Sequence, residues 1–158
     1  MESTYQKNAL QGLSKRWYAN GYTSSEENFK DNLKDGLARY FDETGKIIRE
    51  MNYIRDTLHG ESKEYHANGR VKIQSLYAMG QFEGQWLFYS ETGQKVGESQ
   101  FKNGNGFQRG YYPNGKLKRE ITYKQSLKDG LERWYRADGT IEKELIFKNG
   151  ELAQEVNY

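Results

Sequence analysis

Histidine and glutamate are the residues of this chain whose types and spacing could support metal binding. His59 and His66 lie seven residues apart, with Glu61 and Glu64 between them. A zinc site needs Cys, His or carboxylate ligands in a fixed geometry, and the chain contains no cysteine. The two histidines fall in a turn-like connection and in the strand that follows it, among acidic residues that are spread along the whole chain. We therefore expect surface or turn roles for them, and no metal site and no cofactor.

A column of glutamates is the other candidate for chemistry. Paired carboxylates cleave glycosidic bonds, but such a pair occurs once in an enzyme. Here a glutamate recurs at one position of five sequence repeats, which favours a structural role. The recurring glycines are no phosphate cradle either, because no helix follows them. We expect no catalytic residue and no enzymatic activity. The column consists of Glu26, Glu50, Glu98, Glu120 and Glu144.

The elements that carry these residues are six copies of a unit of about 24 residues. Each copy opens with a glycine, and we number its positions from that glycine as zero. A second glycine stands at position 9, and aromatic residues stand at positions 5 and 17. A fixed period of this length indicates a repeat architecture. The copies span 12–35, 36–59, 60–83, 84–105, 106–129 and 130–153, between an N-terminal half-repeat (1–11) and a C-terminal tail (154–158).

The composition indicates a thin core built from aromatic rings. The mean hydropathy of −1.07 would suit a disordered chain, but 15% of the 158 residues are aromatic. The 24 basic and 22 acidic residues are well mixed and give a net charge of +2. A focused basic patch, which nucleic-acid binding requires, is not expected. The N-terminal residues lack the apolar stretch of a secretory leader, and we expect a cytoplasmic protein.

Each copy is predicted to form a β-hairpin around its second glycine. Thr44 and Thr92 occupy position 8, where a two-residue type I′ loop would need a positive φ that β-branched residues resist. A three-residue loop needs a positive φ at the glycine alone, and Pro113 at position 7 suits its type I turn. This loop sets position 5 opposite position 11, as in Phe41 opposite Ile47. The other pairs expected are Tyr65–Val71, Tyr111–Leu117 and Tyr135–Ile141.

The charged residues of the repeat favour the other loop. A two-residue loop would place a basic residue at position 3 opposite the column glutamate at position 14. Each such pair contributes roughly 0.2–1 kcal/mol, whereas burial of one large side chain contributes about 1.5–3 kcal/mol. We therefore choose the three-residue loop, which puts both aromatic columns on one face of the sheet. The charge pairs set aside by this choice are Lys15–Glu26, Arg39–Glu50, Arg109–Glu120 and Arg133–Glu144.

The predicted fold is all-β and consists of a single domain. It is an extended and curled, meandering antiparallel sheet of about six tandem hairpins, capped by half-repeats. Tyr5 stands where an aromatic of position 17 would stand in a preceding copy. The connection 102–105 is two residues shorter than the others, and we expect the curvature to change there, between the fourth and fifth hairpins.

The pattern G-x-x-x-x-[WYF]-x-x-[NTD]-G, followed by E-x-x-[YF], resembles the MORN-repeat variant of bacterial YwqK-type proteins. The resemblance covers roughly residues 5–150. It implies a meandering sheet with one hairpin per repeat. Such proteins are commonly regarded as antitoxin or immunity components of toxin–antitoxin pairs. Other MORN proteins resemble scaffolds, and some are linked to membrane lipids.

Aromatic residues outside the two columns are the candidates for partner binding. In the register chosen above, even positions of the first strand point away from the aromatic face, and tyrosine, tryptophan and arginine are enriched at interface hot spots. We expect a protein partner, such as a cognate toxin that is neutralised by direct binding. The alternative is a scaffold on membrane lipids, which the balanced charge does not favour. Unpaired outer strands would permit a homodimer through the sheet edges. The candidates are Arg16, Tyr18, Tyr40, Trp86, Phe88, Tyr112, Trp134 and Arg136.

Overall fold

The computed structural model describes residues 4–6 and 8–158, and these residues form β-strands joined by turns. Contacts along the chain divide it into two compact units, one up to Gly80 and one from Gln81 to Tyr158. None of the described residues belongs to a helix that could cross a membrane. The prediction of an all-β repeat protein is confirmed.

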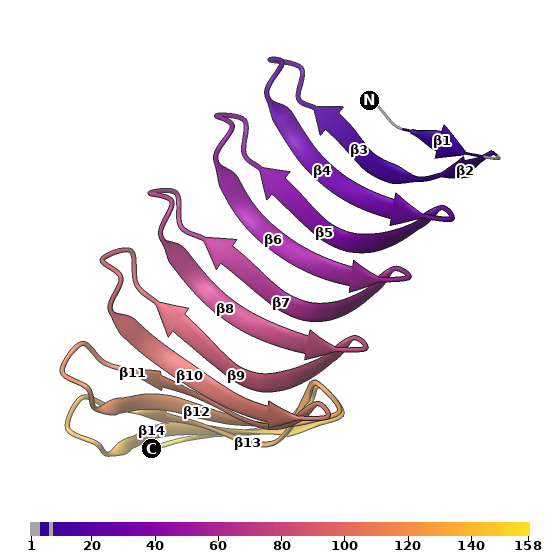
Figure 1. Cartoon of the computed structure of the whole chain (residues 1–158). Coiled ribbons are helices and arrows are strands. Elements are labelled where there is room, and N and C mark those ends of the chain that lie inside the picture. Colours follow the sequence, from indigo (N-terminus) through magenta and orange to yellow (C-terminus); the bar gives the residue numbers. More distant parts are fainter. Residues whose placement is uncertain (1–3, 7) are drawn as a thin grey trace. The chain divides into compact units, whose positions relative to one another are not determined.

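The first unit is a meander in which each strand pairs with its neighbours in the sequence (Figure 1). Its six consecutive strands β3 to β8 form three antiparallel hairpins, and a short pair, β1–β2, precedes them. The strands are β1 (Tyr5–Gln6), β2 (Ala9–Leu10), β3 (Gly12–Trp17), β4 (Thr23–Lys30), β5 (Leu33–Phe41), β6 (Ile47–Ile54), β7 (Thr57–Tyr65) and β8 (Val71–Ala78).

The second unit repeats this arrangement with three further hairpins and a closing strand. Its strands are β9 (Gln81–Tyr89), β10 (Lys95–Lys102), β11 (Asn105–Tyr111), β12 (Leu117–Lys124), β13 (Leu127–Tyr135), β14 (Ile141–Lys148) and β15 (Glu151–Asn157). The tail predicted for 154–158 thus contributes to a strand.

The three-residue loop is confirmed in all six hairpins. In the second, the Gly45 N–H donates to the Asp42 carbonyl, and the Asp42 N–H donates to the Lys46 carbonyl. Gly45 has a φ of 82°, the left-handed region that glycine adopts without a steric penalty. The Thr44 N–H and hydroxyl both donate to the Asp42 carboxylate, which fixes the turn. The four predicted pairs of positions 5 and 11 all occur.

A β-bulge next to each loop overturns the predicted faces of the sheet. In the first hairpin Trp17 lies opposite Thr23 and Arg16 lies opposite Ser25, so the register skips Ser24. One extra residue in the second strand shifts the parity of all pairs beyond it. Position 3 therefore lies opposite position 14 after all, and the opening glycine lies opposite position 17. Directly opposed residues share a face, so the two aromatic columns lie on opposite faces, and the prediction of a single aromatic face is wrong.

These pairings define two faces, which are the same in each unit. The charged face carries positions 1, 3, 5, 11 and 14. The core face carries positions 2, 4, 13, 15 and 17. The buried residues come from the core face, and most of them are small or polar. They are Ser14, Ser25, Glu27, Ala38, Ser62, Ser75, Ser99, Phe101, Ile121 and Glu132.

Two-residue turns connect consecutive hairpins at the strand ends opposite the three-residue loops. Both residues of each turn have a positive φ, as in Met79 (48°) and Gly80 (79°). In five of the six copies, the side chain just before the opening glycine accepts a hydrogen bond from such a turn, whereas Gln11 donates to the Asp31 carboxylate. His59 does so through Nδ1, 3.3 Å from the Met79 nitrogen. Asp35, Glu83, Asn105 and Asp129 play the same part. His59 thus has the turn role expected of it.

The short fourth repeat changes the second unit at β11. This strand has seven residues, whereas β9 and β13 have nine. Figure 1 shows β9 and β10 face on and β11 to β14 almost edge on, so the sheet turns where the two residues are missing. Gly97 lies directly opposite Gly110 across this junction. A Cβ at Gly97 would lie 2.7 Å from the Arg109 carbonyl oxygen, so the absence of a side chain at Gly97 lets the two strands approach closely.

The ends of the chain continue the repeat. Tyr5 pairs with Leu10 as Tyr53 pairs with Leu58, which confirms its equivalence to position 17. Residues 1–3 and 7 of the predicted half-repeat lie outside the described residues. At the other end the Tyr158 hydroxyl donates to Glu144, as the position-5 tyrosines do in complete copies.

Candidate functional site

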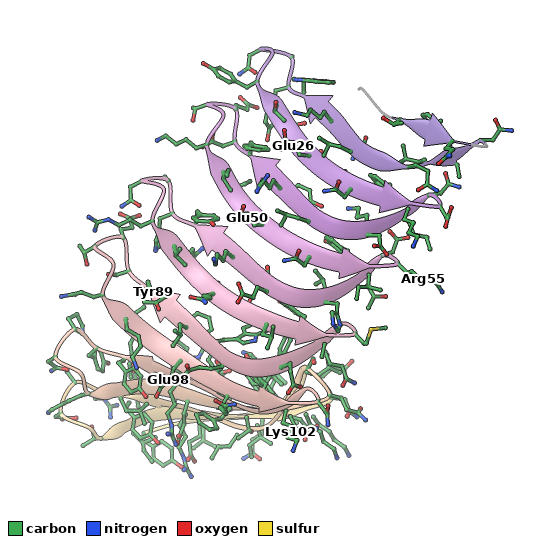
Figure 2. The ribbon with its side chains drawn as sticks, viewed as in Figure 1. Glu26, Glu50, Arg55, Tyr89, Glu98 and Lys102 are labelled. Carbon is green, nitrogen blue, oxygen red and sulfur yellow. The ribbon has the colours of Figure 1, made fainter. Side chains whose placement is uncertain are left out.

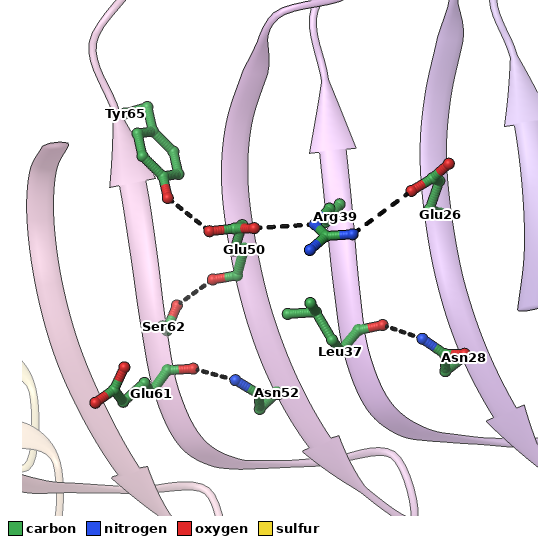
Figure 3. A network of polar contacts seen from close by, with 9 residues as sticks. All are labelled: Glu26, Asn28, Leu37, Arg39, Glu50, Asn52, Glu61, Ser62 and Tyr65. Carbon is green, nitrogen blue, oxygen red and sulfur yellow. Dashed lines mark hydrogen bonds and ion pairs between the residues drawn. The ribbon is translucent and has the colours of Figure 1, made fainter. Parts of the chain in front are cut away.

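The charged face is a row of alternating charges that neutralise one another. Arg39 lies between two column glutamates: its Nη1 is 3.9 Å from Glu26, and its Nε is 3.0 Å from Glu50. The Tyr65 hydroxyl donates to the other oxygen of Glu50 at 2.6 Å (Figure 3). Hydrogen bonds from Tyr65 and Arg39 hold the pKa of the Glu50 carboxyl below its usual range. The four charge pairs set aside from the sequence all form, with distances of 2.5–3.6 Å.

Amide side chains tie neighbouring hairpins together beside this row. Asn28 Nδ2 donates to the Leu37 carbonyl at 2.7 Å, and Asn52 Nδ2 donates to the Glu61 carbonyl at 2.8 Å (Figure 3). Figure 2 shows Glu26 and Glu50 in the middle of the first unit's sheet, with Arg55 at its two-residue turns. The charged face is thus held by contacts internal to the chain.

The core face of the first unit contains a buried carboxylate, Glu27, that is 1% exposed. Its Oε1 is 2.5 Å from Lys34 Nζ and accepts a hydrogen bond from the Tyr40 hydroxyl at 2.9 Å. Its Oε2 is 3.2 Å from Arg16 Nη1. We call these four residues the Glu27 cluster. A buried carboxylate with two cations within reach keeps its charge.

Electrostatics in the Glu27 cluster follow from these contacts. Burial alone would raise the pKa of the Glu27 carboxyl, but the hydrogen bonds and charges of its partners outweigh burial and hold it below the usual range. The pKa of Lys34 is raised, because the bonds to Glu27 and Tyr40 outweigh burial. Burial, together with the Glu27 charge, raises the pKa of Tyr40 to about 12. Glu27, Lys34 and Tyr40 therefore stay in their ordinary ionisation states at neutral pH.

A second buried carboxylate, Glu132, occupies the core face of the second unit. It is 2% exposed. Lys128 Nζ lies 2.7 Å from its Oε2, and Arg119 Nε lies 3.0 Å from its Oε1. Trp134 Nε1 donates to Oε1 at 2.8 Å. This Glu132 cluster has the same composition as the Glu27 cluster: one carboxylate, one lysine, one arginine and one aromatic donor.

Aromatic rings fill the core face of the second unit beside the Glu132 cluster. The Trp86 ring centroid lies 4.5 Å from that of Phe82 and 5.2 Å from that of Phe101. Phe101 meets Tyr123 edge to face at 5.5 Å. Such pairs add about 0.5–1.5 kcal/mol each beyond the area that they bury. Phe101 is 3% exposed, so the centre of this ring cluster is buried.

Each unit has a further feature of its own on the core face. In the first unit a hollow of about 380 Å³ is lined by Tyr40, Ile48, Arg49, Met51 and Tyr53. In the second unit the Trp134 ring is flanked by Arg119 and Lys143, whose charged groups lie 4.7 and 5.3 Å from its centroid. Half-buried rings beside cations are the chemistry of protein-binding surfaces.

The structure divides the predicted partner-binding residues into two groups. Tyr40, Trp86, Phe88 and Trp134 lie half-buried on the core face, where they share that face with the position-17 rings instead of standing apart from them. Tyr18 and Tyr112 lie at the hairpin loops, and their hydroxyls bind carbonyls of the next hairpin. Arg16 belongs to the Glu27 cluster, and Arg136 binds the carbonyls of Ile141 and Tyr158.

The two buried glutamates were not expected from the sequence, although a signal exists. Lys34 and Lys128 stand two residues before the opening glycines of the second and sixth copies, where leucine or phenylalanine precedes the opening glycines of the first, third and fourth copies. A lysine in an otherwise apolar position indicates a buried acidic partner. Among the described residues no group of His, Cys, Asp or Glu has the arrangement of a metal site.

Comparison with known families supports the repeat interpretation. The family model of the MORN repeat variant matches residues 34–55, 58–78, 82–103, 105–125 and 128–149. No curated protein matches the chain. Each matched segment begins near the start of the first strand of one hairpin and ends at or just before the two-residue turn that follows it. The five segments cover more than half of the sequence, and the chain therefore belongs to the MORN-repeat variant family and is a repeat scaffold for binding.

Proposed function

We propose that the protein is a non-catalytic, cytoplasmic scaffold that binds another protein through its core face. One observation carries the proposal: this face presents half-buried rings beside cations in an open, single-layered sheet. The hollow beside Tyr40, Arg49 and Tyr53 offers a pocket for a partner side chain. The charged face also has a ring beside a cation, because Arg109 lies 4.6 Å from the Phe107 ring centroid, but its arginines and glutamates form a row of pairs.

The finer form of the proposal is that the partner is a cognate toxin, neutralised by direct binding. It rests on the resemblance to YwqK-type proteins. A rigid sheet would act sterically, by covering the active site of the toxin or by blocking its assembly. The first test is co-expression with the product of the neighbouring reading frame, read as co-purification and as rescue of growth. A partner that is bound without rescue would leave the scaffold standing and remove the antitoxin role.

A matched pair of arginine variants tests the face. Arg49 and Arg39 lie in the first unit on opposite faces, each with a glutamate partner and with 48% and 42% of the side chain exposed. We expect Arg49→Ala to weaken binding of the co-purified partner about tenfold or more, as for an interface hot spot. Arg39→Ala should leave the affinity nearly unchanged. The opposite ranking, measured by calorimetry, would assign binding to the charged face and overturn the proposal.

A further inference from the structure

The loops of neighbouring hairpins are joined by side chains that donate to carbonyls. The tyrosine at position 6 donates its hydroxyl to the carbonyl of position 5 in the next hairpin: Tyr18 to Phe41 at 2.6 Å, and Tyr112 to Tyr135 at 2.7 Å. A lysine at position 10 donates to the carbonyl of position 7 in the next hairpin. These lysine bonds are Lys46 to Ala67 and Lys116 to Ala137, both at 3.0 Å.

The fourth hairpin has short side chains at both donor positions. Ser90 stands at position 6 and Gln94 at position 10. The Ser90 hydroxyl is engaged within its own loop, with Thr92 Oγ1 at 2.8 Å and the Gln94 N–H at 3.2 Å. A serine side chain is too short to cross to the next hairpin as tyrosine does.

A hollow of about 580 Å³ lies where these donors would be. It runs between the loops of the fourth and fifth hairpins, within the second unit, and its lining includes Ser90, Gln94, Tyr111 and Pro113. Tyr111 and Pro113 occupy positions 5 and 7 of the fifth hairpin, whose carbonyls are the acceptors in the other loops. The β10–β11 ladder ends at Gly97 and Gly110, so the Tyr111 carbonyl lies beyond the last strand pair.

The chemistry of the hollow suits a ring and a donor together. Tyr112, Pro113 and Val96 provide apolar lining. Lys95 also lines it, but its charge is matched by Glu98, 3.0 Å away. A ring that carries a hydrogen-bond donor would therefore contact apolar walls and reach the Tyr111 carbonyl. An ammonium group beside it would reach the Pro113 carbonyl.

We propose that this hollow binds a tyrosine side chain and a neighbouring lysine of a partner protein. The partner would supply the hydroxyl and the ammonium that the chain supplies to itself in the loops of the fifth hairpin. This site is separate from the core face, so its failure would leave the proposed function untouched, and failure of the core face would leave this site untouched.

Tyramine is the probe, because it carries a phenol and an ammonium on one short chain. Titration of the full ¹⁵N-labelled protein at millimolar tyramine should shift amide signals of Ser90, Val96 and Tyr112. Phenethylamine, which lacks the hydroxyl, and 4-hydroxyphenylacetate, which reverses the charge, should bind several-fold more weakly. Equal binding of all three compounds, or no shifts at these residues, would overturn the proposal.

Two variants that fill the hollow distinguish tyramine binding at this site from non-specific binding of an aromatic ring elsewhere on the protein. Ser90→Tyr restores the side chain found in the first and fifth hairpins, so it should fill the hollow, abolish tyramine binding and raise the midpoint of thermal unfolding. If Ser90→Tyr does not fold, Gln94→Lys is the second variant. It restores the other donor and should weaken tyramine binding severalfold. Glu43→Tyr, at an exposed loop position of the first unit, is the matched control and should bind tyramine unchanged. Persistence of binding in the filled variants contradicts the proposal.

Discussion

At the scale of single residues, the least expected feature is a charged group in the core of each unit. Removal of one member of a buried ion pair leaves its partners without compensation, which is why such pairs are costly to break. Glu27 is 1% exposed, whereas the side chains of Lys34 and Arg16 are 30% and 55% exposed. The cations can therefore reach water, but the carboxylate cannot. The stability of the cluster depends on the charge of Glu27.

We predict that Glu27→Gln lowers the free energy of unfolding by about 1–3 kcal/mol at neutral pH, because hydrogen bonds to a charged group are lost. The pKa of Glu27 is below its ordinary value of 4.5 in the folded protein. The unfolded chain therefore binds a proton first, and the contribution of Glu27 is lost as the pH falls below about 4.5. Urea denaturation at a series of pH values should show the difference between wild type and variant shrinking in that range.

Glu43→Gln is the control for this prediction, because Glu43 is exposed at a loop. It should follow the wild type at every pH. A difference between wild type and Glu27→Gln that stays constant from neutral pH to pH 3 would mean that packing, and not charge, holds the cluster.

At the scale of elements, the loop was predictable and the strands beyond it were predictable only in part. Thr44 and Pro113 select the three-residue loop, and the pairs next to it follow. The sequence favours both this loop and the Arg39–Glu50 pair, and the conflict between them indicates an irregularity in the strand. A single register cannot satisfy both, but a bulge can, because one skipped residue changes the parity of the strand. The sequence thus indicates both the pair of positions 5 and 11 and the charge pair of positions 3 and 14. Only the assumption of a strand pairing without a bulge was wrong.

The same bulge limits how much of the core face could be predicted from the sequence. Its outlying aromatic residues were foreseen, but its buried glutamates were not. Tyr40, Trp86 and Trp134 are partner-binding candidates because they are aromatic residues outside the two aromatic columns. Their packing against position-17 rings was missed, because parity was counted without the bulge. Glu27 was missed for the same reason, because period-two alternation assigns no face beyond a skipped residue. Glu132 stands before the loop, on the side of its strand that the sequence analysis placed away from the core.

The junction of β10 and β11 provides a prediction at this scale. A Cβ at Gly106 would lie 1.9 Å from the Gln100 carbonyl oxygen and 2.9 Å from the Phe101 ring. Backbone atoms cannot yield as a flexible side chain does, so Gly106→Ala should cost about 3 kcal/mol or more. Urea denaturation should show a lower midpoint, or the variant should fail to fold.

Gly110, in the same strand, is the matched control. The nearest atom to a Cβ there is the Val96 oxygen at 3.9 Å, and no unusual φ is needed. Gly110→Ala should be neutral or slightly stabilising, because alanine restricts the unfolded chain. Equal losses for both variants would show that the cost does not come from the contact between position 106 and the Gln100 carbonyl.

At the scale of the whole molecule, one contact recurs in both units. A tyrosine at position 5 donates its hydroxyl to the column glutamate of the preceding copy: Tyr65 to Glu50 in the first unit, and Tyr111 to Glu98 and Tyr135 to Glu120 in the second. Only the neutral phenol can donate. Each of these hydrogen bonds on the charged face therefore exists only while its tyrosine is protonated.

This row predicts a loss of stability at alkaline pH. Burial and the hydrogen bond to Glu50, with its charge, raise the pKa of Tyr65 to about 12 from its ordinary value of 10.0. Burial and the neighbouring glutamate likewise raise the pKa of Tyr111 and that of Tyr135. The unfolded chain releases these protons first, so their contribution is complete below about pH 10 and is lost as the pH rises towards 12.

Tyrosine absorbance during titration and urea denaturation at a series of pH values measure this effect together. The wild type should lose stability above about pH 10, and Tyr65→Phe should lose less over the same range, because the variant has one fewer raised pKa. Lysine deprotonation acts on both proteins and cancels in the difference. Tyr22→Phe, at a side chain that is 52% exposed, should leave the pH dependence as in the wild type. If Tyr65→Phe and the wild type lose stability in parallel, the tyrosine–glutamate contacts do not set the alkaline limit.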